Sequence, residues 1–379
     1  MKKQNDSFQV QCYLWGALLL FFLLFHACVH PIVRSASSRQ SPLFAVGKFQ
    51  SLDMNLYWFG TQTRCVQAGH KGSSRYYDPA KPTMLYVHGW QIGATGKRMR
   101  EDFWFRHAGG PKKDVTQAWR NKGWNLGMMY WNQLSDESDV QHAEAKIWSI
   151  HGPKKMRWQS LDKRYHSGSS LKEPVGVQLA KTYMRQMKHQ KGRIRLVGHS
   201  LGSQAVLAML QVLFRKVRAG TFPARLLPKR VALLDPFFSN GTKLWLNGKT
   251  PAEHSRPILH ELLRRGILLE VYYTSGMVNH PLIGDPNRPL TKMAAVSVLK
   301  PHYFHGLDFP RKHIMARWYY FWSMSFPAPK VVGTGQKGLS AGISDTALRW
   351  WMNSPFKTVQ QKGSGTLTLR DDVMGLHRK

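Results

Sequence analysis

The chain has 379 residues, of which 42% are hydrophobic and 20% charged. This composition is that of an ordinary globular protein and excludes both a short peptide and a disordered chain. The charge is unbalanced, because 55 Lys and Arg residues stand against 21 Asp and Glu residues, for a formal net charge of +34. Such a chain is attracted to anionic surfaces. The cations are scattered along the sequence, which favours a general positive field and disfavours a dedicated nucleic-acid-binding module.

The amino terminus has the pattern of a signal peptide. Lys2 and Lys3 precede an apolar stretch at 13–25, and small residues follow at 35–37. We expect residues 1–36 to be a leader cleaved near 35–37, which implies export. An uncleaved membrane anchor is the alternative, and lipid attachment at Cys28 is a weaker one.

Cysteine usage excludes an internal disulfide framework. Of the three cysteines, Cys12 and Cys28 lie in or beside the leader, which leaves Cys65 alone in the mature chain. A core of sufficient size must therefore hold the fold together.

The elements expected after the leader alternate between strands and helices. Strands are expected at 43–47, 54–59, 83–87, 124–131, 231–234 and 267–273, and in the apolar run that starts at 194 and ends in the motif at 198–202. Helices are expected around 104–119 and at 175–187, 205–217, 258–263 and 313–322. Residues 135–172 are polar and basic, and we expect a partly helical insertion there. This alternation predicts a parallel sheet.

The last 53 residues, 327–379, are expected to be a C-terminal extension. They contain a Gly-rich stretch at 333–342, which is typical of a flexible linker, and a candidate strand at 366–369. They are too few for a β-sandwich, which needs about a hundred residues. The domain organisation expected is thus a leader at 1–36, one α/β domain at 37–326, and this extension.

One motif carries most of the chemical information. Residues 194–202 read Ile-Arg-Leu-Val-Gly-His-Ser-Leu-Gly, so that an apolar strand ends in Gly198-x-Ser200-x-Gly202 and a helical pattern follows. A serine that acts as a nucleophile must project from a sharp turn, and glycines on both sides allow such a turn. We therefore predict that Ser200 is a nucleophile; an ordinary helix-capping serine is the alternative.

A serine nucleophile also needs an acid, a base and donors for the oxyanion. Asp235 follows the apolar run 231–234 and precedes Pro236, which suits an acid at the carboxyl edge of a strand. Asp285 and Asp308 are reserve candidates. The backbone amides of Trp90, in His88-Gly89-Trp90, and of Leu201 are the expected oxyanion donors.

The base is a histidine that spacing alone does not identify. The candidates that follow the acid at a workable distance are His260, His280, His302, His305 and His313. His313 lies at the start of the last expected helix, from which its ring can reach the sheet edge, and His305 is the alternative base.

Together these segments resemble the pancreatic-type lipase family, which has the α/β-hydrolase fold. The resemblance covers 43–322 and is carried by residues 88–90, by Val175-Gly176-x-x-Leu179-Ala180, by 196–202, by Leu234-Asp235-Pro236, by Tyr273-Thr274, and by His313 followed by Tyr319-Tyr320. It implies a mostly parallel central sheet flanked by helices, and it favours His313 as the base beside Ser200 and Asp235.

The resemblance also implies an activity. The expectation is a serine carboxylester hydrolase of lipase or phospholipase type that acts on lipid esters and needs no metal and no cofactor. An esterase for soluble esters is left open. The positive charge, and not the resemblance, predicts association with anionic membranes. A noncatalytic lipid- or polyanion-binding protein on the same scaffold is the alternative. The chain departs from the family in lacking its disulfides and its C-terminal sandwich, and the lid interval, 275–304, contains Gly284-Asp285-Pro286, which predicts a turn there.

Overall fold

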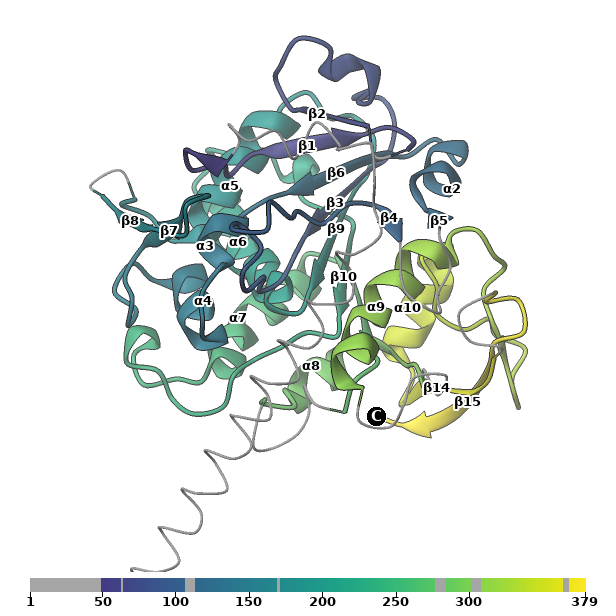
Figure 1. The fold of residues 1–379 in the computed structure, drawn as a ribbon. Helices are drawn as coiled ribbons and strands as arrows, with labels where there is room; N and C mark the ends of the chain where they lie inside the picture. Colours follow the sequence, from purple (N-terminus) through teal and green to yellow (C-terminus); the bar gives the residue numbers. More distant parts are fainter. Residues whose placement is uncertain are drawn as a thin grey trace, which may run out of the picture.

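The computed structural model describes residues 49–62, 64–105, 113–168, 171–276, 284–300, 308–363 and 368–379. Within them lies one large central sheet with helices on both faces (Figure 1). The expected leader, its cleavage site and the expected strand at 43–47 fall outside the described residues. No helix within those ranges is both long and apolar enough to span a membrane.

The sheet has eleven strands in the order β13-β15-β14-β12-β11-β10-β9-β3-β6-β1-β2. Its pairs are parallel from β6 through β3, β9, β10, β11 and β12 to β14, whereas β1 pairs antiparallel with β2 and β6, and β14 with β15. The strands are β1 (Leu56–Phe59), β2 (Cys65–Gln67), β3 (Thr83–Val87), β6 (Asn125–Met129), β9 (Ile194–His199), β10 (Arg230–Leu234), β11 (Leu268–Tyr273), β12 (Ala295–Val298), β13 (Lys330–Val331), β14 (Phe356–Lys362) and β15 (Val373–Arg378).

The order of the strands in the sheet reverses at β3, and a reversal of this kind marks the place where a ligand site is expected. The chain runs from β3 to β6 on one side and then returns to β9 on the other side of β3. Ligands of open parallel sheets bind beyond the carboxyl ends of the strands at such a reversal. The carboxyl ends of β3 and β9 therefore mark the expected site.

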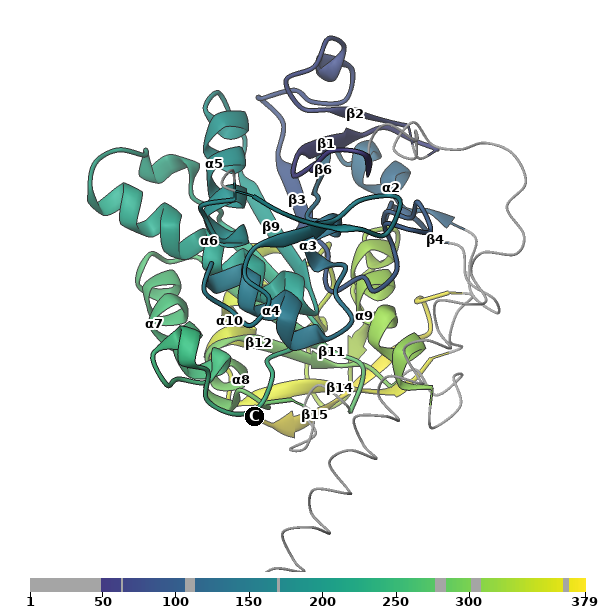
Figure 2. The same ribbon diagram turned by 60° about the vertical axis from the view of Figure 1, so that its left-hand side comes forward.

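The helices form two layers, and the strands alternate their side chains between them. Leu85 and Val87 of β3 pack in one apolar cluster, with α5 and α6, while Met84 and Tyr86 pack in another, with α9. Figure 2 shows α5, α6 and α7 on one side of the sheet and α9 on the other. The helices are α2 (Thr116–Asn121), α3 (Asn132–Ser135), α4 (Val140–Trp148), α5 (Val175–Met187), α6 (Leu201–Arg218), α7 (Pro251–Arg264), α8 (Arg288–Met293), α9 (Phe309–Ser323) and α10 (Asp345–Asn353).

Two expected segments differ from the structure. Trp104 and Phe105, expected in a helix, form the short strand β4 (Trp104–Phe105), which pairs with β5 (Lys113–Asp114), and the helix α2 begins only at Thr116. Phe105 is buried against Trp318 of α9, so tertiary packing overrides the local pattern. The insertion at 135–172 is partly helical, through α4, and also contains a hairpin of β7 (Arg157–Gln159) and β8 (Tyr165–Ser167).

The residues after 327 are part of the central sheet. They contribute β13, α10, β14 and β15, while the expected strand at 366–369 lies partly outside the described residues, and 368–369 are not in a strand. The prediction of a flexible linker at 333–342 is wrong, because Leu339, Ser340 and Ala341 are buried.

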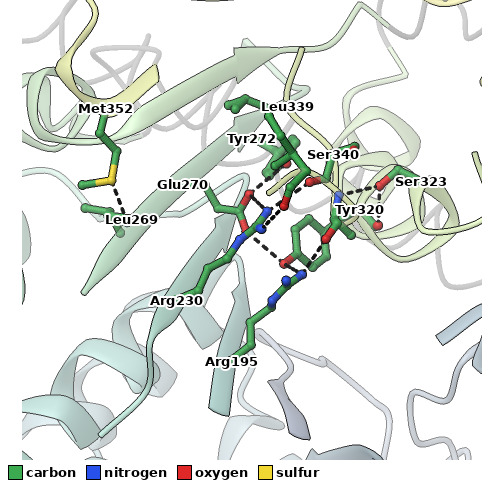
Figure 3. A network of polar contacts seen from close by, with 12 residues as sticks. Arg195, Arg230, Leu269, Glu270, Tyr272, Tyr320, Ser323, Leu339, Ser340 and Met352 are labelled. Carbon is green, nitrogen blue, oxygen red and sulfur yellow. Dashed lines mark hydrogen bonds and ion pairs between the residues drawn. The ribbon is translucent and has the colours of Figure 1, made fainter. Parts of the chain in front are cut away.

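A buried ion pair explains why this stretch is fixed. Arg230 of β10 donates two 2.6 Å hydrogen bonds to the carboxylate of Glu270 on β11, and it also donates to the backbone oxygens of Ser340 and Ile343 (Figure 3). Tyr272 and Tyr320 donate to the same carboxylate. The guanidinium thus ties the polypeptide after α9 to the sheet.

Candidate active site

Ser200 lies in a strained turn between β9 and α6. Its backbone has φ 55° and ψ −126°, a conformation that non-glycine residues rarely adopt and that costs about 1–3 kcal/mol. Its amide donates to the Leu234 oxygen and its carbonyl accepts from Phe237, so the neighbouring strand β10 holds the turn in place. A serine that only capped the helix would accept a hydrogen bond from the first turn, and no such side-chain bond is recorded for Ser200. The geometry is that of a nucleophile elbow.

The two flanking glycines are needed for close packing. A methyl group built on Gly198 would lie 2.5 Å from the Gly202 oxygen, and one on Gly202 would lie 2.2 Å from the Val87 oxygen. Neither glycine has the positive φ that would itself require glycine, so glycine is needed because α6 lies so close to β9 and β3. The elbow therefore tolerates no side chain on either side.

Asp235 lies at the carboxyl end of β10, as expected, and its side chain is fully buried. One carboxylate oxygen accepts from the Thr274 amide at 2.9 Å and the Ser275 amide at 3.4 Å. The other accepts from the Ser275 hydroxyl and from Nδ1 of His313, each at 2.6 Å. These donors fix the orientation of the carboxylate.

His313 lies in the second turn of α9 and is only 6% exposed. Since Asp235 accepts from Nδ1, the neutral ring has its lone pair on Nε2, the nitrogen that can take a proton from a nucleophile. Nε2 of His199, the residue before Ser200, donates to the backbone oxygen of His313 at 3.0 Å. The elbow and the helix that carries His313 are therefore in direct contact.

The remaining candidates have other positions. Asp285 accepts from the Asn287 amide in a turn before α8, and Asp308 is the N-cap of α9, where it also pairs with Arg311. Neither carboxylate is bonded to His313 in the described contacts. His305, the alternative base, lies outside the described residues, as do His280 and His302.

The loop after β3 lies against Ser200. A methyl group on Gly89 would lie 2.8 Å from Cβ and 3.3 Å from Oγ of Ser200, so the Gly89 backbone faces the serine side chain. The indole nitrogen of Trp90 donates to the backbone oxygen of Glu137 at 2.7 Å, which anchors this loop to the segment before α4. The structure thus brings the expected oxyanion loop to the elbow.

His88 orients this loop, a role the sequence argument missed. Its Nε2 accepts from the Trp131 amide at 3.1 Å, so Nδ1 carries the proton and donates to the Gly89 oxygen at 2.9 Å. Complete burial lowers the pKa of His88 to about 4, which keeps the ring neutral. Because a trans peptide directs its carbonyl and its N–H in opposite directions, fixing the Gly89 carbonyl toward His88 aims the Trp90 N–H away from that ring.

The second expected donor, the Leu201 amide, begins α6. The first amides of a helix have no intrahelical acceptor, and the eighteen-residue helix adds the positive end of its dipole at Ser200. Both features favour negative charge at this point. No group of three or more His, Cys, Asp or Glu residues that could hold a metal ion occurs in the described part of the chain.

Ser275 and its neighbour Thr274 are the other site residues that the sequence argument did not assign. They follow the carboxyl end of β11, which pairs in parallel with β10, so they reach the same sheet edge as Asp235. The parallel order of neighbouring strands was the signal that could have found them.

The class of protein follows from three features: the strand order, the elbow at Ser200, and the buried pair of Asp235 and His313. The chain has the α/β-hydrolase fold, with a mostly parallel central sheet flanked by helices. No protein-family model and no curated protein sequence matches it.

Several solved structures are similar to the chain. The LpqC poly(3-hydroxybutyrate) depolymerase from Bordetella parapertussis is 11% identical, with 73% of this chain and 82% of that chain covered and a TM-score of 0.30. A lipase-esterase related protein from Clostridium acetobutylicum is 13% identical, with 63% and 93% covered and a TM-score of 0.29. Est1E from Butyrivibrio proteoclasticus is 8% identical, with 70% and 97% covered and a TM-score of 0.28. The assignment of the fold rests on the strand order and on the Ser200 turn.

Proposed function

We propose that the chain is a serine carboxylester hydrolase that cleaves acyl esters of lipids, of triacylglycerol lipase or phospholipase A1 type. The observation that supports this most strongly is the buried pair of Asp235 and His313, which is joined to the strained Ser200 elbow through His199. A serine hydrolase needs this combination of an acid, a base and a serine on a sharp turn. The signal-peptide pattern at 1–36 supports export of the enzyme as part of the proposal.

The reaction follows from the roles of these groups. Oγ of Ser200 bonds to the acyl carbon while its proton passes to Nε2 of His313, and the carbonyl oxygen takes the negative charge. The amides of Trp90 and Leu201 stabilise that charge. The imidazolium, paired with Asp235, then gives its proton to the departing alcohol as the ester bond breaks. Water, deprotonated by His313, hydrolyses the acyl-enzyme and restores the serine.

The test is turnover of a soluble aryl butyrate by the purified chain and by single variants. Ser200→Ala and His313→Ala should each lower kcat by at least about 10⁴-fold, because the nucleophile and the base act as one unit. Ser167→Ala, on the exposed end of β8, and His305→Ala are the matched controls and should retain activity. Survival of activity in His313→Ala would overturn the assigned base.

Product analysis then identifies the substrate class. Release of fatty acid from triolein emulsions would indicate a lipase, and formation of 2-acyl lysophospholipid from phosphatidylglycerol vesicles would indicate a phospholipase A1. A chain that hydrolyses neither and turns over no aryl ester, yet binds anionic vesicles, would contradict the proposal and favour the noncatalytic alternative.

A further inference from the structure

Four exposed cations lie on two short segments beyond the carboxyl end of β3. Lys97 and Arg98 are on the loop that continues from Gly89 and Trp90, and Lys163 and Arg164 are on the turn between β7 and β8. We call these four residues the basic rim. Asp162 is the only acidic residue in either segment, 93–98 or 160–167, and it pairs with Arg164. The rim therefore carries a local excess of positive charge.

The two segments are in contact. A methyl group built on Gly96 would lie 3.0 Å from Cε and 3.1 Å from Cγ of Lys163, so the alkyl chain of Lys163 lies on the Gly96 backbone. The carboxylate of Asp136 accepts from the Gly93 and Thr95 amides at 2.6 and 2.8 Å, and the Tyr165 hydroxyl donates to the Asp136 backbone oxygen. Asp136 thus fixes both segments in place.

The rim belongs to the same sheet edge as the candidate active site. Its first segment begins a few residues after Gly89, which contacts Ser200. The amide of Gln91, between Gly89 and that segment, donates to the backbone oxygen of Ser135. Figure 1 shows the β7–β8 hairpin projecting from the body of the molecule beside α3. A surface that contacts this rim would also approach the sheet edge at which Ser200 lies.

An aromatic side chain accompanies the cations. The Tyr165 side chain is 37% exposed, and the guanidinium of Arg157 lies over its ring at 3.8 Å. Lysine and arginine heads beside a tyrosine ring suit the interface between lipid headgroups and acyl chains, because each side chain has an apolar body and a polar end.

We propose that the basic rim is a docking surface for an anionic bilayer, whose phosphate groups bind Lys97, Arg98, Lys163 and Arg164 and bring the active-site edge to the lipid. This inference rests on the proposed function, since it supplies the orientation in which a lipid ester would meet Ser200. It differs from attraction by the overall charge of +34, because it assigns binding to one place.

The experiment compares two double variants that remove the same charge. Both are made in full-length protein with Ser200→Ala, so that the vesicles stay intact, and binding to mixed phosphatidylglycerol–phosphatidylcholine vesicles is measured by co-sedimentation. Lys97→Gln with Lys163→Gln removes two rim cations. Lys188→Gln with Lys191→Gln removes two exposed cations that precede β9, at the opposite edge of the sheet.

The rim variant should bind about 25-fold more weakly, about fivefold for each cation, and the control variant should change by less than about twofold. Equal weakening by both pairs would overturn the inference in favour of a general field, as would absence of vesicle binding. Displacement by free glycerol phosphate would also overturn it, because the site would then be a phosphate pocket and not a bilayer surface. Lys97→Gln with Arg164→Gln repeats the test if the first pair fails to fold.

Turnover of the soluble aryl ester separates this inference from the proposed function. With Ser200 restored, the rim variants should keep soluble-ester activity within about twofold and lose activity only on anionic vesicles. Vesicle binding at the rim without any ester turnover would refute the proposed function alone, whereas turnover with binding elsewhere would refute the rim alone.

Discussion

Two non-glycine residues at the candidate site have positive φ. Ser200 has φ 55° and Asp235 has φ 41°, and each ends a strand where the backbone turns sharply away from the sheet. Hydrogen bonds from the surrounding structure hold these strained turns: the Ser200 amide donates to the Leu234 oxygen, and the Asp235 amide donates to the Tyr272 oxygen. The turns bring the two side chains to the same edge.

The contact of Gly89 with Ser200 leads to a prediction about one methyl group. In Gly89→Ala the new Cβ would lie 2.8 Å from Ser200 Cβ and 2.9 Å from the His199 oxygen, so the loop with the Trp90 amide must shift. We expect kcat on an aryl ester to fall by about 10²-fold, the effect of losing one oxyanion donor. Gly335→Ala, at an exposed position with no neighbouring atom within 4 Å, should leave kcat unchanged. Full activity in Gly89→Ala would show that the loop does not serve the oxyanion.

The buried neutral histidines predict a pH dependence of stability. Burial lowers the pKa of His88 to about 4, and burial together with His313 lowers the pKa of His199 to about 3, from 6.5 in the unfolded chain. Below pH 6.5 the unfolded state binds protons that the folded state does not, so the free energy of unfolding should fall as the pH falls from 6.5 toward 4. Each histidine contributes a slope of about 1.4 kcal/mol per pH unit.

Urea unfolding of His88→Asn between pH 6.5 and 4 checks this dependence. The slope should be smaller than in the wild type by about 1.4 kcal/mol per pH unit, while His189→Asn, at an exposed position, should keep the full slope. An unchanged slope in His88→Asn would mean that His88 is protonated in the folded state.

At the scale of elements, helix α9 is held to the loop after β3 by an ion pair. Arg317, one turn after His313, contacts the carboxylate of Glu101, which also accepts from the Tyr86 hydroxyl at 2.7 Å. Burial alone would raise the pKa of Glu101, but Arg317 beside it lowers that pKa to about 2. The pair therefore fixes the helix that carries the base relative to the loop that carries the oxyanion donor.

Breaking this pair on one side should destabilise the protein. Glu101→Gln leaves Arg317 mostly buried without a counter-charge, and we expect the free energy of unfolding to fall by about 3 kcal/mol, as measured by urea unfolding. The combined variant Glu101→Gln with Arg317→Met should recover part of the loss, because it also removes the uncompensated charge. A double variant less stable than Glu101→Gln alone would contradict this explanation.

At the scale of the whole molecule, the C-terminal 53 residues complete the sheet and cover a charged pair. Arg230 reaches the Ser340 and Ile343 oxygens, Arg195 donates to the Ala341 oxygen, and Trp351 of α10 is fully buried. Removal of this segment would leave the edge of β12 without its neighbour β14 and leave two buried guanidinium groups with fewer acceptors.

A chain that ends at residue 326 should therefore not fold. We expect it to be insoluble, or to show no cooperative thermal transition by circular dichroism, whereas a chain that lacks only residues 1–36 should unfold cooperatively. A soluble, cooperatively folding chain ending at 326 would show that the C-terminal segment is a dispensable extension.

The elements predicted best from the sequence are those whose residues show a clear apolar run or helical spacing. The strand at 83–87 and the helix at 175–187 have the predicted bounds, because continuous apolar runs and helical spacing both face the core there. The strand β14 was missed, since Phe-Lys-Thr-Val-Gln-Gln-Lys is polar and lies near the sheet edge. The linker at 333–342 was misread because glycines suggested mobility, while the fixing groups, Arg195 and Arg230, lie more than 100 residues earlier.

The candidate site residues that directly follow a predicted strand could be found from the sequence. Ser200 and Asp235 end apolar strands, so their positions followed from the parallel sheet. Choosing His313 over the other histidines required either the family resemblance or the structure, because a base in a later helix can come from any distance along the chain. The roles of His88, His199 and Ser275 depend on contacts between strands and could not be found by spacing.

The most direct test of the central claim is to find which residue reacts with a serine-directed fluorophosphonate. Labelled wild-type protein, digested and mapped by mass spectrometry, should carry one adduct, on Ser200, and labelling should fall by at least about 10³-fold in His313→Ala because the hydroxyl is then no longer deprotonated. Labelling elsewhere, or at an equal rate without His313, would contradict the account.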